Sequence, residues 1–229
     1  MIKVIKKGKY YFFFKSNGVI KTYANNKIKV ADVIVAKQLA KYMSVCFKSK
    51  KKEKSFFLRV LFFSFDLDKS SKSDIIDKIL FFLSTDLLCY RAKKNSELES
   101  MQKKLWDPLI SFVEDKYKLI FNTTNGVVPI THKGTNKGRL CKILKKLNKL
   151  ELTIYYYIIN ISNSNIIALN FLANNINFKH AWKCLSLEED YNLKKWGQDK
   201  EANEKLLEKK SYFNEIIKLY LLFKNLRNK

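Results

Sequence analysis

The residues of this chain that could do chemistry are two histidines, four cysteines and scattered carboxylates. His132 and His180 lie far apart and form no metal-ligand spacing, so we expect ordinary surface or capping residues. Asp86 and the acidic run at 188–190 could pair as acid and base, but no sequence pattern places a cleft around them. We therefore expect no catalytic residue, no metal and no enzyme. An unrecognised hydrolase has only these scattered carboxylates in its favour.

The cysteines and glycines also lack functional spacing. No C-x-x-C pair occurs, so the sequence predicts neither a zinc site nor a thioredoxin-like motif, and free thiols in a reducing compartment fit better. The phosphate-binding patterns G-x-x-x-x-G-K-[ST] and G-x-G-x-x-G are both missing, as is the G-x-S-x-G elbow. We expect no nucleotide and no cofactor. The four cysteines are Cys46, Cys89, Cys141 and Cys184.

The chain carries a formal net charge of +24, which would concentrate nucleic acid, anionic lipid or an acidic partner around it. Nearly all of the basic residues are lysine, and asparagine, isoleucine, phenylalanine and tyrosine are plentiful. That composition is typical of a strongly AT-rich genome. A phosphate-binding footprint needs clustered arginine or a recognisable module as well. A basic RNA- or anionic-surface-binding protein therefore remains the alternative function, and nucleic acid is not the favoured partner.

Two apolar segments invite a membrane interpretation. Residues 56–65 are short and contain Arg59, whereas residues 153–178 have no charged residue but many asparagines and serines. Those polar groups favour a helix buried inside a bundle over one that faces lipid. The N-terminus has no long apolar core and no transit-type pattern, so we expect no membrane span and a bacterial cytoplasmic location, or the mitochondrial matrix in a eukaryote.

The first third of the chain predicts a small antiparallel sheet followed by a helix. The segments "KYYFFF" and "VIKTYA" flank Asn17-Gly18, a pair typical of hairpin turns. Asp32 is placed to cap a helix, because apolar residues then recur at helical spacing. These residues are Val33, Ala36, Leu39, Ala40, Met43 and Phe47.

The middle of the chain predicts a helix, a short strand and a second helix. Ser71 with Asp74 fits a capping box before "IIDKILFFLS", and "DLLCYRA" is typical of a strand. Ser96 with Glu99 forms another capping box. Pro108 should kink the helix that follows or make it restart, with Asp107 as the new cap. The predicted apolar face of this helix is Leu98, Met101, Leu105, Leu109 and Phe112.

From Asn136 onward the pattern is helical. The predicted fold class is therefore α+β, with a small antiparallel β-containing N-terminal domain (1–93) followed by a multihelical C-terminal domain (94–229). One helical stripe is unusual because it mixes aromatic and acidic residues. Glu189 on this stripe either pairs with a lysine across the bundle or meets a partner, and spacing leaves both open. The stripe consists of Trp182, Leu185, Glu189, Leu193 and Trp196.

Four phrases together resemble a known family. "STDLLCYRA", "ELESMQKKLWDPLISFVEDKY", "GVVP" and "AWKCLSLEEDYNLKKWGQDKEA" occur in the order seen in assembly chaperones for the α subunit of F-type ATP synthase, found in mitochondria and α-proteobacteria. The resemblance runs from about Ser84 to the C-terminus, and "NGVIKT" is similar to the family's N-terminal hairpin. It implies a chaperone that binds the free α subunit and shields its β-facing surface until the β subunit displaces it.

The resemblance also implies site residues. The partner-binding candidates are Glu188, Glu189, Tyr191, Trp196 and Gly197. The structural candidates are Asp86, Leu88, Cys89, Tyr90, Arg91, Trp106, Asp107 and Pro108. For Cys89, Trp106 and Pro108 we favour fold maintenance over direct contact, because buried tryptophan and free cysteine usually belong to a core.

The sequence departs from the family at two places and suggests one contact. Lys179-His180 stands where the family commonly has acidic residues, and Val19 stands where it often has Arg-Pro. Both changes alter the local contact chemistry. We expect the phrases around residues 84–117 to form the hinge between the sheet part and the helical part, with Arg91 paired to Asp107.

Overall fold

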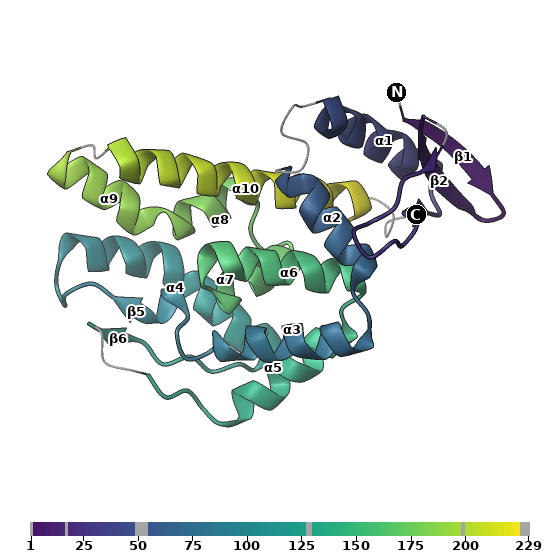
Figure 1. Cartoon of the computed structure of the whole chain (residues 1–229). Coiled ribbons are helices and arrows are strands. Elements are labelled where there is room, and N and C mark those ends of the chain that lie inside the picture. Colours follow the sequence, from purple (N-terminus) through teal and green to yellow (C-terminus); the bar gives the residue numbers. More distant parts are fainter. Residues whose placement is uncertain (1, 17, 49–54, 127–129, 198–199, 225–229) are drawn as a thin grey trace. The chain divides into compact units, whose positions relative to one another are not determined.

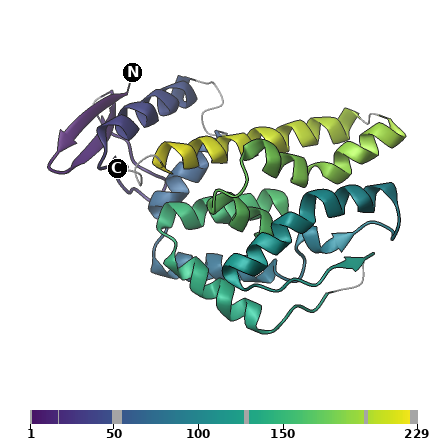
Figure 2. The same ribbon diagram turned by 180° about the vertical axis from the view of Figure 1, so that it is seen from behind.

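The computed structural model describes residues 2–16, 18–48, 55–126, 130–197 and 200–224. These residues divide into two compact units. The first unit contains residues 1–69 and 214–229, and the second contains residues 70–213. Figure 1 and the reverse view in Figure 2 show the elements of each unit. The predicted hairpin residue Asn17, the segment 127–129 of "GVVP" and most of the lysine run at 48–55 lie outside the described residues.

The first unit contains the predicted antiparallel sheet. Strand β2 (Tyr10–Lys15) is central: it pairs with β1 (Lys3–Lys7) along one edge and with β3 (Gly18–Val19) and β4 (Lys29–Val30) along the other. Phe14 lies opposite Val19, as expected for the hairpin. The second predicted strand, 19–24, is shorter than expected, because after Ile20 the chain makes one isolated bridge, between Lys21 and Lys27, and then a turn at 22–25.

Helix α1 (Val33–Lys48) packs against this sheet. Asp32 caps it as predicted, because its Oδ1 accepts hydrogen bonds from the backbone N–H groups of Ile34 (2.7 Å) and Val35 (2.9 Å). Helix α2 (Phe56–Asp66) follows, with Ser55 as its N-cap. The last part of α10 (Lys200–Lys224) belongs to the same unit.

The second unit is mainly helical, and α7 (Asn165–Leu172) lies at its centre in contact with α4, α6 and α8. In both views α3 and α5 lie side by side (Figures 1 and 2), and the Lys72 ammonium of α3 donates to the last carbonyls of α5. Two short strands form a parallel pair. The remaining elements are α3 (Lys69–Phe81), η2 (Leu87–Cys89), β5 (Tyr90–Arg91), α4 (Glu97–Tyr117), β6 (Thr124–Asn125), α5 (Thr135–Lys146), α6 (Lys149–Ser162), α8 (Phe178–Leu185) and α9 (Leu187–Trp196).

Two predicted details of the middle segment are wrong. Helix α3 begins at Lys69, so Ser71 lies inside the helix and does not start it. The segment "DLLCYRA" is a strand only at Tyr90 and Arg91, because the preceding residues form the 3-10 helix η2, which Asp86 caps. An aspartate side chain that accepts from a nearby backbone N–H offers the chain an alternative to the extended conformation.

Helix α4 corrects two more predictions. Its buried face is displaced by one residue from the predicted apolar stripe, because polar side chains occupy it at Glu99 and Gln102. The helix also continues through Pro108 without restarting, and Asp107 caps no new helix. Pro108 is exposed, so the missing bond falls on the solvent side. The buried face is Glu99, Gln102, Trp106, Leu109, Ile110 and Val113.

The uncharged segment at 153–178 is buried as predicted, but it forms two helices. Asn163 adopts a left-handed conformation (φ 51°) that ends α6, and Ser164 caps α7. Ile154, Ile158 and Ile167 are fully buried. Of the helices in the described segments, none combines the length and the apolar character that crossing a bilayer requires.

The predicted helix across residues 182–196 is likewise divided. Ser186 leaves helical geometry and separates α8 from α9, and the two helices follow one another in both views (Figures 1 and 2). The predicted stripe from Trp182 to Trp196 is therefore not one continuous helical face.

The fold class is confirmed: antiparallel strands form the start of the chain, and helices dominate the remainder. The two compact units divide at residue 69/70, and the segment 214–229 returns to the first unit. The domain division at 93/94 stays a prediction about folding domains.

Candidate functional site

A buried glutamine joins three segments of the second unit. The Gln102 side chain is fully buried on α4; its Oε1 accepts from the backbone N–H of Ala92 at 2.8 Å, and its Nε2 donates to Glu188 Oε1 at 2.6 Å. A buried amide that is satisfied on both sides fixes the positions of its partners. The hydrogen bond between Gln102 and Glu188 thereby attaches helix α9 to α4.

Glu99, one turn before Gln102 on α4, forms a second group of hydrogen bonds. Its carboxylate accepts from the backbone N–H of Asn95, from the Asn125 amide and from the Lys103 ammonium. These bonds, led by that from Asn125, lower the pKa of Glu99 to about 2. The loop before α4 and strand β6 are therefore bound to the start of α4 by one ionised side chain.

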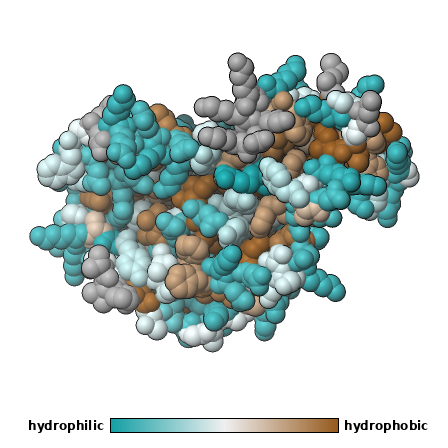
Figure 3. Space-filling model, in the orientation of Figure 1, coloured by the Kyte–Doolittle hydropathy of each residue, from teal (hydrophilic) through white to brown (hydrophobic). Residues whose placement is uncertain are grey.

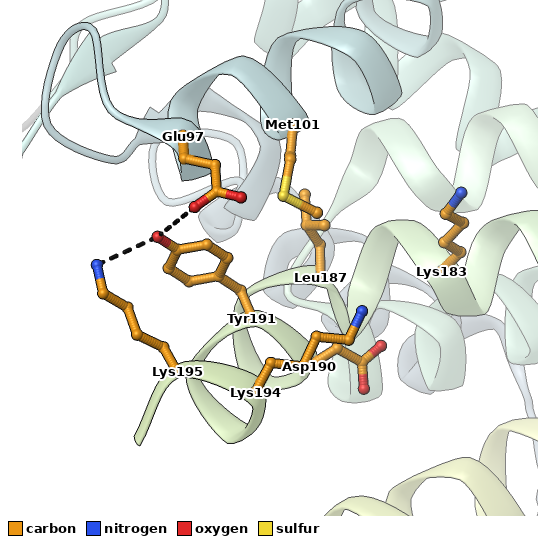
Figure 4. Close-up of a pocket in the computed structure, with 8 residues that line it drawn as sticks. All are labelled: Glu97, Met101, Lys183, Leu187, Asp190, Tyr191, Lys194 and Lys195. Atoms are coloured by element: carbon orange, nitrogen blue, oxygen red, sulfur yellow. Dashed lines mark hydrogen bonds between the residues drawn. The ribbon is translucent and has the colours of Figure 1, made fainter. Parts of the chain in front are cut away.

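A pocket of about 390 Å³ lies between the first turns of α4 and helices α8 and α9 (Figure 4). Its apolar part is made by Met101 and Leu187, which lie close together in Figure 4. Tyr191 lies beside them and donates from its hydroxyl to Glu97 Oε2 at 3.3 Å, while the Lys195 ammonium donates to the same hydroxyl at 3.3 Å. The other lining residues are Lys183, Asp190 and Lys194.

The two neighbouring glutamates of α9 have different environments. Glu188 is half-buried against Gln102, and burial raises the pKa of its carboxyl, with the adjacent charge of Glu189 acting in the same direction. Glu189 is more accessible and pairs with the Lys209 ammonium at 3.3 Å. The lysine pairing predicted as one alternative for Glu189 is thus present. Partner contact by the same carboxylate is untested.

Trp196 ends α9 and is 78% exposed. The Lys195 ammonium lies 5.7 Å from the indole ring centre of Trp196. Gly197 follows with φ 86° and ψ 176°, a conformation that residues with a Cβ rarely adopt. An exposed tryptophan contributes little to the core and is a typical anchor in protein interfaces.

The predicted structural residues lie inside the second unit. Asp86 is fully buried and accepts hydrogen bonds from Ser164 Oγ (2.7 Å) and from the N–H groups of Leu88 and Ile166 (both 3.1 Å). Burial raises the pKa of Asp86 to about 6, although these bonds act in the opposite direction. Leu88 and Cys89 are fully buried, and the Tyr90 hydroxyl donates to the Ser84 carbonyl at 2.8 Å.

The predicted contact between Arg91 and Asp107 is present, with Nη2 and Oδ1 2.7 Å apart. The Arg91 guanidinium also lies over the Trp106 ring, 5.1 Å from its centre. Trp106 is fully buried and donates from its indole N–H to the Cys184 carbonyl at 3.0 Å. Fold maintenance is therefore the simplest role for Trp106 and Cys89, in agreement with the sequence-based interpretation, while the roles of all eight structural candidates stay predictions.

The arrangement is suited to binding and shows no catalytic constellation within the described segments. No group of three or more histidine, cysteine, aspartate or glutamate side chains that could hold a metal occurs there. All four cysteines are free. The pocket combines lysines, carboxylates, a phenol and a thioether, which is the mixed composition of a transient protein-binding surface.

Sequence reasoning missed most of the pocket. The sequence predicts Tyr191 as a partner-binding residue, but it predicts no such role for Glu97, Met101 or Leu187. Their meeting depends on the packing of α4 against α9, segments almost a hundred residues apart. Gln102 was missed because a glutamine among apolar residues is normally assigned to the exposed side of a helix.

Comparison with known proteins finds one matching family model and several solved structures of the same fold. Residues 17–114 match the family model described as ATP12 chaperone protein, which is a little under half of the chain. Atp12 from Paracoccus denitrificans superposes with a TM-score of 0.83 over 96% of this chain and 95% of that one, at 17% identity. A point mutant of the same protein superposes with a TM-score of 0.84 over 96% of this chain and 94% of that one, again at 17% identity. The Atu1473 protein of Agrobacterium tumefaciens gives 0.79 at 20% identity, with 96% of this chain and 84% of that chain covered.

The structural matches, all below 25% identity, establish the shared fold, and the family model matches the part of the chain from residue 17 to residue 114. The resemblance noted in the sequence is confirmed by this match to the ATP12 chaperone family model over residues 17–114 and by the shared fold.

Proposed function

We propose that this chain binds the free α subunit of F-type ATP synthase and covers its β-facing surface until the β subunit displaces it. The match of residues 17–114 to the ATP12 chaperone family model is the observation that carries this proposal. We further propose that it is no enzyme, and that it acts in the cytoplasm of an α-proteobacterium, or in the matrix if it is mitochondrial.

The physics of ring assembly explains the need for such a protein. A lone subunit of an obligate ring exposes a large apolar interface, which favours aggregation until it is covered. A chaperone that must leave again has to bind less strongly than the final neighbour. A surface that mixes aromatic and charged groups meets this requirement better than a wholly apolar one.

The end of α9 is the surface we propose for this contact. Trp196 is the exposed aromatic anchor, Tyr191 lines the adjacent pocket, and Glu189 is accessible beside Lys209. Gly197 would let the chain turn immediately after the anchor. Glu188 would act indirectly by holding α9 on α4, because its carboxylate accepts from Gln102.

The decisive experiment is co-expression with the α subunit of the host's own ATP synthase. We expect the two proteins to co-purify at physiological salt and to separate when the β subunit is added. An α subunit that stays insoluble, or that co-purifies equally with an unrelated basic protein, would contradict the proposal.

The net charge of +24 supports one alternative, a basic RNA- or anionic-surface-binding protein. Such binding would weaken steeply with salt, because each neutralised phosphate releases counterions. Capture of RNA but not of the α subunit, with log affinity falling linearly against log salt concentration, would establish this alternative.

A further inference from the structure

A second pocket lies in the first unit, between the sheet and α1. It measures about 590 Å³ and is larger than the pocket beside α9. Its apolar surface comes from Ile2, just before β1, from Val4 on β1, and from Ala40 and Val45 on α1. Figure 3 shows hydrophobic residues gathered over this sheet and helix, beside strongly hydrophilic ones.

The rim of this pocket carries charge of one sign. Lys37, Lys41 and Lys48 line it, and their spacing of four and seven residues places them on one face of α1. No carboxylate lines the pocket within the described part of the chain, and the sequence of α1 contains no acidic residue. The lysine stems add methylene surface to the apolar floor, while the ammonium groups stay in water.

The apolar floor is open to solvent at one end. Val45 is 66% exposed. Ile2 is buried, and its backbone N–H donates to Ser44 Oγ at 3.4 Å. Ile2 is thus held against α1.

We propose that this pocket binds an acidic amphipathic helix of a protein partner. Apolar side chains of such a helix would lie on Val4 and Val45, and its carboxylates would meet the three lysines. The charge complementarity selects the occupant, because an acidic rim on the ligand matches a lysine rim without any carboxylate. This site is separate from the α9 surface and does not depend on the identity of the α subunit as client.

The test uses the full chain and two synthetic peptides of about 15 residues, labelled for fluorescence anisotropy. The first peptide contains only leucine, alanine and glutamate, patterned so that leucine occupies one helix face. The second replaces every glutamate by glutamine. We expect saturable binding of the acidic peptide and at least about tenfold weaker binding of its neutral counterpart.

Variants then locate the binding. The double variant Lys37→Glu and Lys41→Glu should weaken the acidic peptide at least about tenfold, and Val45→Gln should weaken both peptides. The matched control is Lys21→Glu with Lys27→Glu, which changes net charge equally at exposed positions outside the pocket. Melting midpoints close to that of the unchanged chain would show that each variant folds.

Three results would overturn the proposal. Equal loss in the pocket variant and the control would mean that only net charge matters. Equal binding of the two peptides would remove the acidic requirement. Binding of dodecanoate without binding of the acidic peptide would assign the pocket to an acyl-chain ligand instead. None of these results involves the α subunit, so failure here is distinguishable from failure of the proposed function.

Discussion

Arg91 and Asp107 form an ion pair in which one partner is buried and the other is in water. The Arg91 side chain is 4% exposed and that of Asp107 is 54% exposed. Asp107 thus compensates a guanidinium whose pKa is lowered by burial. The pair connects β5 to the middle of α4.

This asymmetry predicts which half of the pair matters more. Asp107→Ala should lower the free energy of unfolding by about 2 kcal/mol or more, because it leaves a buried charge without its partner. Arg91→Ala removes that charge. We therefore expect the free energy of unfolding to fall by about 1–2 kcal/mol, because the packing on Trp106 and the hydrogen bond to Asp107 are lost. Urea denaturation of both single variants and the double variant measures this.

The control is Asp115→Ala, at an exposed carboxylate on the same helix. It should change stability by less than about 0.5 kcal/mol. If Asp107→Ala behaves like this control, Arg91 does not depend on its partner. Unchanged melting of Arg91→Ala together with unchanged α-subunit binding would remove any role for the pair.

Trp196→Ala tests the proposed anchor. Because the side chain is largely in water, the melting midpoint should stay within a degree or two, whereas α-subunit capture should fall by about tenfold or more. Leu207→Ala is the matched control, since Leu207 is another exposed apolar residue of the second unit. Equal capture by both variants would exclude Trp196 as an anchor.

The two interpretations of Glu189 can be separated. If its role is only the pair with Lys209, Glu189→Gln and Lys209→Met should each cost about 0–1 kcal/mol and leave α-subunit capture unchanged. If Glu189 also contacts the partner, Glu189→Gln alone should reduce capture. Pull-down yields of the two variants, measured side by side, decide the question.

The buried carboxyl of Asp86 predicts a pH effect on stability. Its pKa is raised to about 6 in the folded state, above the ordinary value of about 3.9 for an unfolded chain, so the folded state holds more protons between pH 4 and pH 6. The contribution of Asp86 to the free energy of unfolding is most favourable below about pH 4, and it is lost as the pH rises through 6. The free energy of unfolding falls by roughly 2–3 kcal/mol over this range.

Asp86→Asn removes this titration. The stability difference between the original chain and the variant should therefore change between pH 4 and pH 7, in the direction that favours the original chain at low pH. Urea midpoints at four or five pH values measure it. If the urea midpoints of the two proteins change in parallel across this pH range, Ser164 and the two backbone N–H groups keep Asp86 ionised throughout.

The cysteines should differ in reactivity. Burial raises the pKa of the Cys89 and Cys184 thiols, that of Cys184 to about 12, so few thiolates form there at pH 8. Cys46 and Cys141 are partly accessible. Iodoacetamide followed by mass spectrometry should label Cys141 and Cys46 first and all four cysteines in urea. Early labelling of Cys89 would contradict its burial.

Local signals predicted much of the fold. Asp32 and Ser96 cap the helices that their positions indicate, and the spacing from Ala36 to Met43 predicts the buried face of α1 correctly, although Val33 is exposed and Val35 is buried instead. These features depend on residues only a few positions apart. Propensity and capping act over this range, so a sequence can reveal them without knowledge of the neighbouring elements.

Features that depend on distant contacts could not be predicted in this way. The buried face of α4 is displaced by one residue because Glu99 and Gln102 find partners on β6 and α9. The break at Ser186 contains neither glycine nor proline, and its side chain bonds to Asp190. The pocket beside Tyr191 exists only because α4 and α9 meet. Tyr191 and Trp196 were named from family phrases, and no spacing in this chain would have found their surroundings.

The first unit is assembled from both ends of the chain. Residues 2–69 supply its sheet and two helices, while the part of α10 after Phe213 returns to it with buried Ile216, Ile217 and Leu219. During synthesis at the ribosome, residues 70–213 are therefore all available before the first unit has its last helix. The helical unit can fold early, whereas the pocket of α1 is presented on a unit that is completed only when translation has passed residue 224.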